Sequence, residues 1–291
     1  MKLLFKFNLI LGLVFAAGLA VSALVSFRFL EDNARDDVVR QARLMMEAMS
    51  SVRQYTGVQL QPLLARQQEK ESDFIPQTVP AFAATENFNY LRHHYPDYAY
   101  KEAALNPTNL RDRAADWEAD VINSFRAGST LRELVGERDT PTGRSLFYAR
   151  AIAADAPCLT CHSTPSAAPP AVIKSYGPDH GFGWQPNEII GAQIVSVPMA
   201  VPEAMARASF RTLVTSLAIV LVASLALLDL VLILAVVRPL RKLSAMADQI
   251  SVGQMDIPEL PVTGKDEIAV LAGSFNRMRR SLEKALKMLD S

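Results

Sequence analysis

The sequence predicts an α+β domain enclosed by two transmembrane helices and followed by a pair of cytoplasmic helices. Two apolar runs, at 8–27 and 212–237, are long enough to cross a bilayer, since a spanning helix needs about 20 residues. Between the runs, segments with helical and with strand-like periodicity alternate. After the second run, apolar residues recur at heptad spacing. The predicted parts are therefore an N-terminus at 1–7, the spans at 8–27 and 212–237, an exterior domain at 28–211 and a helical domain at 238–291.

The composition excludes few function classes by itself. Lys plus Arg and Asp plus Glu number 30 each, so no net charge attracts nucleic acid. The hydrophobic share of 50% is concentrated in the two apolar runs. No Ser/His/Asp set, carboxylate cluster or phosphate-binding glycine loop is apparent in the sequence. We therefore expect a membrane protein that is not an enzyme and binds no nucleic acid.

The first apolar run is interpreted as an uncleaved anchor. A cleaved signal peptide is the alternative, because Lys2 and Lys6 precede the run, but twenty apolar residues exceed the usual hydrophobic region of about 7–15. Basic residues also follow the second run, at Arg238, Arg241 and Lys242. The positive-inside rule then places both termini in the cytoplasm, and the segment between the runs in the periplasm, of a bacterial inner membrane.

Both cysteines of the chain lie in the segment "CLTCH", residues 158–162. In a C-x-x-C-H motif each thiol adds to one vinyl group of a porphyrin, and the histidine that follows directly can bind the iron. Cys158 and Cys161 are therefore predicted to attach one covalent haem c per chain. His162 is predicted to be the proximal ligand of the haem iron.

Three other interpretations of the two cysteines fit less well. A thioredoxin-like pair needs a helix N-terminus that lowers the thiol pKa, whereas "STPSAAPPA" follows here and cannot continue a helix. A zinc site needs four ligands, and few other histidines are available. A disulfide across two intervening residues would close a small, strained loop.

The second axial position of the iron has two weak candidates. His94, in "YLRHHYPDY", and Tyr55, in "VRQYTGV", are the predicted distal residues. The alternatives are a solvated surface histidine and an ordinary half-buried tyrosine. A five-coordinate or water-bound iron is an equally good prediction.

Within the exterior segment we expect a long helix at 31–69, a strand at 98–105, a helix at about 110–127, and strands at 145–154 and 188–199. Strands on both sides of the cysteine motif, with short helices on one face of the sheet, indicate an α+β fold of the PAS-like kind. The long helix has an apolar seam that is expected to pack along a partner helix, against the domain core, or against both; it consists of Val38, Ala42, Met45, Met49 and Val52.

Asp229 is the one charged residue within the second apolar run. A carboxylate there costs about 2–3 kcal/mol on insertion scales, so it should face other helices. Control of helix packing and simple tolerance near the interface are both consistent with its position.

The segment after the second run resembles a HAMP domain over residues 238–288. Pro239 suits a first helical turn, and the acids at 266–267 suit the start of a second helix. Two short amphipathic helices cannot bury their apolar stripes alone, whereas a homodimer can form a parallel four-helix bundle. A coiled coil that only dimerises is the alternative. The stripes are Leu240, Leu243, Ala247 and Ile250, then Ile268, Leu271, Phe275, Met278, Leu282, Ala285 and Leu289.

The exterior segment resembles bacterial sensor proteins whose periplasmic PAS-like domain binds one c-type haem. The similar segments are "YKEAALNPTNLRDRAADWEADVI", "CLTCH" and "GFGWQPNEIIGAQIVSVPM". The resemblance implies that Trp184 and the preceding "GFG" form a structural loop near the haem. Some relatives supply a cysteine from the first helix as second axial ligand, and this chain has no third cysteine. Relatives often continue into a kinase, cyclase or methyl-accepting module, so we expect a separate output protein here.

The expected function is that of a dimeric inner-membrane haem c sensor. It would detect redox state or a diatomic ligand such as NO, CO or O2, and relay the change through HAMP to a cytoplasmic output protein such as a separate kinase. The alternative is a membrane-anchored c-type cytochrome that passes electrons to a periplasmic redox partner, although such a protein has no need of a HAMP domain. A redox enzyme with an open iron site has no other support in the sequence.

Overall fold

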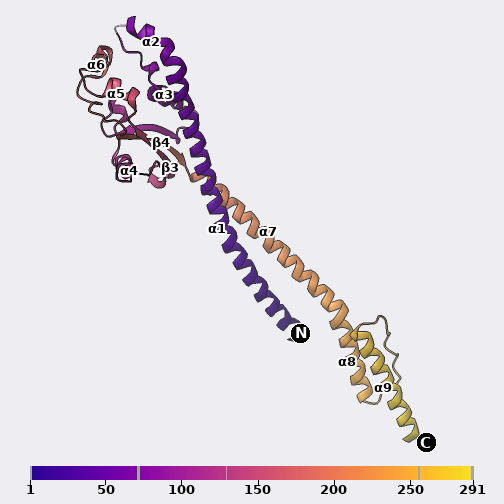
Figure 1. The fold of residues 1–291 in the computed structure, drawn as a ribbon. Helices are drawn as coiled ribbons and strands as arrows, with labels where there is room; N and C mark the ends of the chain where they lie inside the picture. Colours follow the sequence, from indigo (N-terminus) through magenta and orange to yellow (C-terminus); the bar gives the residue numbers. More distant parts are fainter. Residues whose placement is uncertain (1, 71–72, 129, 255, 290–291) are drawn as a thin grey trace. The chain divides into compact units, whose positions relative to one another are not determined.

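The computed structural model describes residues 2–70, 73–128, 130–254 and 256–289. It divides into two compact units, one of Leu24–Phe210 and one of Met1–Ala23 with Arg211–Ser291. Figure 1 shows the elements coloured along the chain.

The larger unit is built on a four-stranded antiparallel sheet. Its strands are β1 (Ala99–Ala104), β2 (Glu133–Thr140), β3 (Gly143–Ala153) and β4 (Ile189–Pro198), in the order β1-β4-β3-β2. The predicted α+β class and three of these strands are thereby confirmed. The fourth, β2, was not predicted because "ELVGERDT" is an edge strand whose charged residues hide the apolar alternation.

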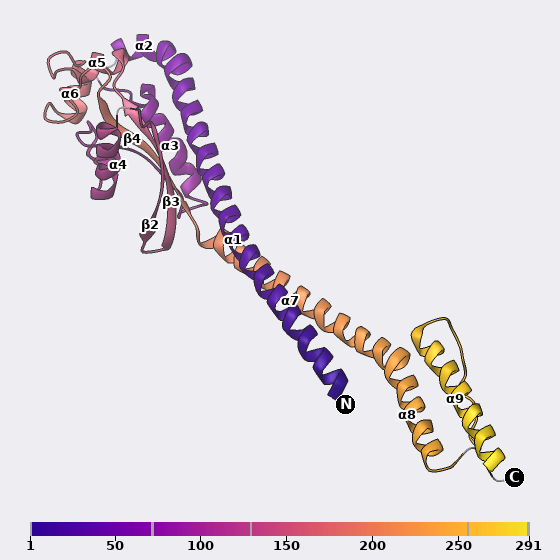
Figure 2. The same cartoon turned by 60° about the horizontal axis from the view of Figure 1, so that its bottom comes forward.

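The register of the sheet fixes where the cysteine motif lies. Ala104 at the end of β1 pairs with Gly191, and Ala153 at the end of β3 pairs with Ile189, so these ends lie beside the start of β4. The motif follows β3 directly. Figures 1 and 2 both show α5 and α6 at this end of the sheet, away from the β2–β3 hairpin.

One face of the sheet is covered by two helices, α1 (Lys2–Tyr55) and α3 (Pro80–Arg92). The seam of α1 packs on the sheet of its own chain, and Met46 takes the fully buried place expected of Met45. Helix α3 contributes Ala84 and Phe88 to the same core. It was not predicted, because Thr, Glu and Asn dilute its apolar periodicity.

The opposite face is covered by α4 (Asp116–Ala127). Its buried Val121, Ile122 and Phe125 pack against Phe147 and Ile194 of the sheet. Helices therefore cover both faces of the sheet, and the expectation of short helices on one face only was wrong. The predicted helix at about 110–127 begins later than expected, after a 3-10 turn at Leu110–Asp112.

The long helix predicted at 31–69 continues past Pro62 into α2 (Gln61–Lys70). A proline ring clashes with the carbonyl one turn earlier in a regular α-helix. Here a π-helical turn, Thr56–Leu60, directly precedes α2 and widens the backbone at that turn. The helix can therefore continue instead of ending at the proline.

Two helical stretches, Phe5–Ala65 and Ala200–Ser251, are long and apolar enough to cross a membrane. The second contains α7 (Ala200–Leu232), a π turn (Ile233–Val237) and α8 (Arg238–Ser251). Within the smaller unit, Asn8 Nδ2 donates to Asp229 Oδ2 at 2.9 Å. The other oxygen of Asp229 is buried without a hydrogen bond among the described residues. Asp229 therefore faces another helix, as expected.

The last helix, α9 (Glu267–Leu289), carries a buried face and a separate exposed apolar stripe. One face packs on the connector, where the Asn276 side chain bonds the Leu260 N–H at 3.1 Å and its carbonyl at 2.9 Å. The predicted heptad stripe lies elsewhere on the helix and stays uncovered in the single chain, with Leu271 46%, Met278 55% and Leu282 42% exposed. An uncovered apolar stripe of this kind is what a second copy of the chain would bury.

A candidate cofactor site at the end of the sheet

The cysteine motif forms one short helix, α5 (Ala156–His162). Asp155 caps it, because its Oδ1 accepts from the Cys158 N–H at 3.2 Å. Residues at i, i+3 and i+4 share one face of a helix, so Cys158, Cys161 and His162 lie on the same side. The helix ends at His162, in agreement with the expectation that the following segment cannot extend it.

The imidazole of His162 is oriented by the loop that follows α6 (Pro170–Tyr176). Nδ1 lies 2.7 Å from the Gly181 carbonyl oxygen, which can only accept, so Nδ1 carries the proton. The Trp184 ring stacks on the imidazole at 3.9 Å with an interplanar angle of 13°. This arrangement leaves Nε2 as the unprotonated nitrogen that a metal would bind.

Burial lowers the pKa of His162, and the hydrogen bond to Gly181 only partly opposes this effect. The ring is therefore neutral at pH 7. A neutral imidazole with one nitrogen held by a backbone carbonyl is the usual form of a histidine ligand.

Gly181 allows the loop to reach His162. Its φ is +81°, and a Cβ placed there would lie 2.8 Å from the backbone of Thr108, so only glycine fits without displacing a neighbour. Asn106 fixes the same loop, since its Oδ1 accepts from the Gly181 N–H at 3.2 Å. The family resemblance placed Gly181, as part of "GFG", and Trp184 in a loop near the motif, and the structure brings both residues to His162. Asn106 and Thr108 were not predicted to belong to the site, because they lie in a different segment from the motif.

The two thiols are not activated. Burial raises the pKa of Cys158 and of Cys161, and the Asp155 carboxylate raises that of Cys158 further. In a thioredoxin-like pair the pKa of the reactive thiol would be lowered instead. Neither cysteine is in a disulfide.

A zinc site finds no support in the described part of the chain. Among those residues, no three or more His, Cys, Asp or Glu side chains gather to hold a metal ion. Two thiols that are not in a disulfide and a neutral imidazole, all on one helical face, do fit the predicted covalent haem. Cys158 and Cys161 would form the thioethers, and His162 would present Nε2 to the iron.

The two distal candidates lie in different places. Tyr55 ends α1 at the same end of the domain as α5, and its side chain is 58% exposed. His94 is exposed and precedes the start of β1, whereas α5 lies near the end of that strand. Five residue steps of β1 separate the two ends by about 17 Å, so the structure does not bring His94 to His162.

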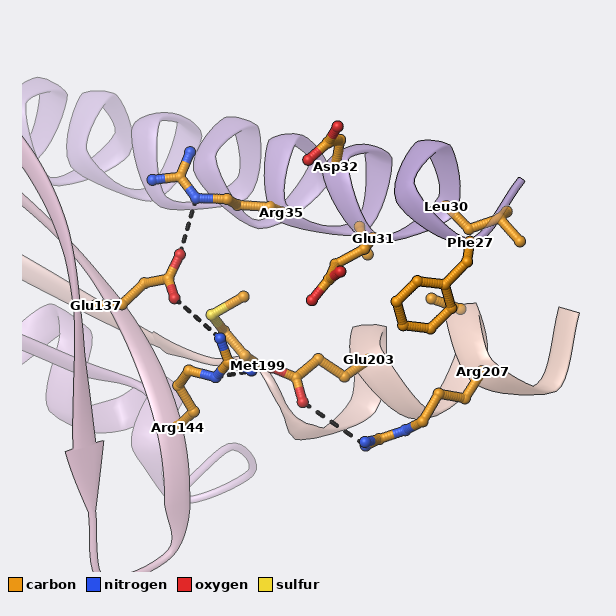
Figure 3. A pocket seen from close by; sticks show the side chains of 12 residues that line it. Phe27, Leu30, Glu31, Asp32, Arg35, Glu137, Arg144, Met199, Glu203 and Arg207 are labelled. Carbon is orange, nitrogen blue, oxygen red and sulfur yellow. Dashed lines mark hydrogen bonds and ion pairs between the residues drawn. The ribbon is translucent and has the colours of Figure 1, made fainter. Parts of the chain in front are cut away.

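At the other end of the domain, a pocket is lined by charged side chains from four elements (Figure 3). Glu137 on β2 accepts from Arg35 on α1 at 2.8 Å and from Arg144 on β3 at 3.3 Å. Arg144 also lies 3.1 Å from Glu203 on α7, which pairs with Arg207 at 3.6 Å. These ion pairs connect the sheet to both helices that lead to the apolar runs. We call this set the junction.

Comparison with known proteins places the two units in known families. Residues 31–198 match the Tll0287-like family, described as Tll0287, and residues 231–284 match the HAMP domain. These matches indicate no catalytic family. Among solved structures, the chain is similar to the cyanobacterial haem protein Tll0287, with 16% identity and a TM-score of 0.42, over 55% of this chain and 94% of that one. A comparison with curated proteins gives no match.

Proposed function

Because the chain belongs to the Tll0287-like family through residues 31–198 and carries a HAMP domain after it, we propose that it is a haem c sensor of the bacterial inner membrane. The proposed topology has cytoplasmic segments at 1–7 and 238–291, spans at 8–27 and 212–237, and a periplasmic domain at 28–211. Two candidate spanning helices and the HAMP match support this assignment.

Cys158 and Cys161 are proposed to attach the haem, and His162 to bind its iron. Bound there, the group would supply an iron that changes its charge by one unit on reduction and can take a diatomic ligand such as NO, CO or O2. The observation that carries the proposal is the geometry of His162. Its Nδ1 is held by the Gly181 carbonyl and its Nε2 is left to bind a metal, on the same helical face as two thiols that are not in a disulfide.

The residues around the site give the imidazole one orientation. The Gly181 carbonyl holds the proton on Nδ1, and Trp184 prevents rotation of the ring by stacking on it. Because this loop leads directly into β4, a displacement of His162 would be passed to the strand that precedes α7.

The junction is the proposed route to the membrane. It connects β2 and β3 with α1 and α7, so movement of the sheet changes ion pairs on both helices. To switch the receiving HAMP bundle almost completely, the two states of the site must differ by about 5.5 kcal/mol in their preference, and a partial response needs less. The uncovered stripe of α9 supports a HAMP homodimer that an output partner reads.

The test is a spectrum of the full chain, purified from cells that can mature cytochromes c. We expect a covalent haem c spectrum that survives denaturation, and a change on adding CO or NO to the reduced form if a coordination position is open. A variant with Cys158→Ser and Cys161→Ser is the control and should lose the covalent haem. A colourless wild-type protein would refute the proposal.

Deletion of 239–291 separates the sensor from the membrane-anchored electron-transfer cytochrome. A sensor loses its response when HAMP is removed, because the readout is gone. A carrier keeps electron transfer to its periplasmic redox partner, since its haem domain and anchors are intact.

A further inference from the structure

A buried polar cluster near the cofactor site has no part in holding the histidine. Arg53 Nη1 on α1 donates to Oε2 of Glu102 on β1, and the Tyr100 hydroxyl donates to Oε1 at 2.7 Å. Gln193 on β4 donates to the Tyr100 oxygen at 3.1 Å. The exposed fraction is 8% for Glu102 and 6% for both Tyr100 and Gln193. Both carboxylate oxygens of a buried acid are therefore satisfied.

Arg53 lies two residues before the end of α1 and pairs with Glu102 near the end of β1. Burial and the Asp155 carboxylate raise the pKa of the Cys158 thiol, and the positive charge of Arg53 opposes them. Glu102 lies two residues before the end of β1, and the segment that follows this strand contacts His162 through Thr108, with Oγ1 at 3.3 Å from Nδ1. The cluster thus connects α1 to the end of the sheet that carries the motif.

Stability alone does not account for this ion pair. Taking two charges out of water costs about as much as their attraction returns, and apolar residues of similar volume often stabilise a core equally well. Tyr100 remains a donor, because burial and the neighbouring Glu102 carboxylate raise its pKa. The cluster is therefore a fixed arrangement of one positive and one negative charge near the end of the sheet that carries the cysteine motif.

We propose that Arg53 is a positioning residue that raises the midpoint potential of the iron and couples the charge of the iron to helix α1. This inference rests on the proposed haem attachment at Cys158 and Cys161. Reduction adds one electron, from any one-electron donor, and converts ferric to ferrous iron. A nearby positive charge disfavours the more positive ferric state, so it raises the potential, and Glu102 offsets part of the effect. By reciprocity, oxidation of the iron repels the guanidinium of Arg53 and so acts on α1.

The experiment is a spectroelectrochemical titration of the full-length, haem-loaded protein in detergent. Arg53→Gln should lower the midpoint potential, Glu102→Gln should raise it, and Arg53→Lys should keep most of the wild-type value because the charge remains. Arg35→Gln is the matched control. Arg35 is also an α1 arginine paired with a sheet glutamate, but lies 18 residues, or about 27 Å of helix, from Arg53.

A shift in Arg53→Gln no larger than that in Arg35→Gln overturns the proposal while leaving haem attachment intact. A wild-type protein without covalent haem overturns both the proposed function and this inference. Thermal unfolding of the haem-free variants checks the fold independently. If Arg53→Gln does not fold, Arg53→Lys and Glu102→Gln carry the test, and an unchanged potential in Glu102→Gln refutes the charge argument.

Discussion

Substitution of Gly181 by alanine should loosen the loop that holds His162. Two costs add at this position. The left-handed backbone, with φ of +81°, costs a non-glycine residue about 1–2 kcal/mol. The new Cβ would also lie 2.8 Å from the Thr108 backbone, and overpacking of this kind costs about 1–3 kcal/mol. The expected loss is therefore about 2–5 kcal/mol.

Gly183 provides the matched control. Its φ is +84°, but a Cβ there meets nothing within 4 Å, so Gly183→Ala pays only the backbone cost. The difference between the two variants isolates the clash with Thr108. The two glycines lie in the same connection between α6 and β4.

The assay is thermal unfolding of the haem-free full chain followed by circular dichroism. For a domain of this size, 1 kcal/mol lowers Tm by about 2–4 °C, so Gly183→Ala should lose about 2–8 °C and Gly181→Ala clearly more. If Gly181→Ala is no less stable than Gly183→Ala, the close approach of the loop to Thr108 is not a feature of the native protein.

Three further predictions follow from separate parts of the chain. The haem-free protein should lose stability as pH falls below about 6.5, because His162 is protonated in the unfolded chain whereas the lowered pKa of the buried ring disfavours protonation in the folded chain. Urea unfolding of His162→Gln should show no such loss. Asn8→Leu should lower the free energy of unfolding in micelles by about 0.6 kcal/mol and at most about 1.7 kcal/mol. Combining it with Asp229→Leu should restore much of the loss. An unchanged free energy of unfolding in Asn8→Leu argues against the hydrogen bond between Asn8 and Asp229. Met278→Glu should dissociate the dimer in analytical ultracentrifugation, whereas Val270→Glu, on an exposed position outside the heptad stripe, should not; equal behaviour of the two would contradict the assigned stripe.

The sequence predicts an element well where its apolar residues follow one period over the whole length. The strands β3 and β4 are continuous buried runs, and α4 shows a clear apolar face, so their types could be predicted. Strand β2 and helix α3 could not, because charged and polar residues interrupt their apolar patterns and their burial comes from neighbours in space. Propensity is a weak signal for such elements, since tertiary packing overrides it.

Only part of the candidate site could likewise be predicted from the sequence. The motif residues are contiguous, so Cys158, Cys161 and His162 could be found from their spacing. The Gly181 carbonyl is 19 residues from His162, and Glu102 is 49 residues from Arg53. Contacts between segments of this kind depend on strand order and register, which no local pattern encodes. The distal position of the iron stays a prediction for the same reason.

Strand β4 is central in the sheet and continues almost directly into α7. It is hydrogen-bonded to β1 along one edge and to β3 along the other. A pull along β4 would load both ladders in shear, and a slip by one residue would exchange the side chains that pack on its two covered faces. Sliding of β4 past its neighbours is therefore costly, whereas a tilt of the whole sheet keeps both ladders intact.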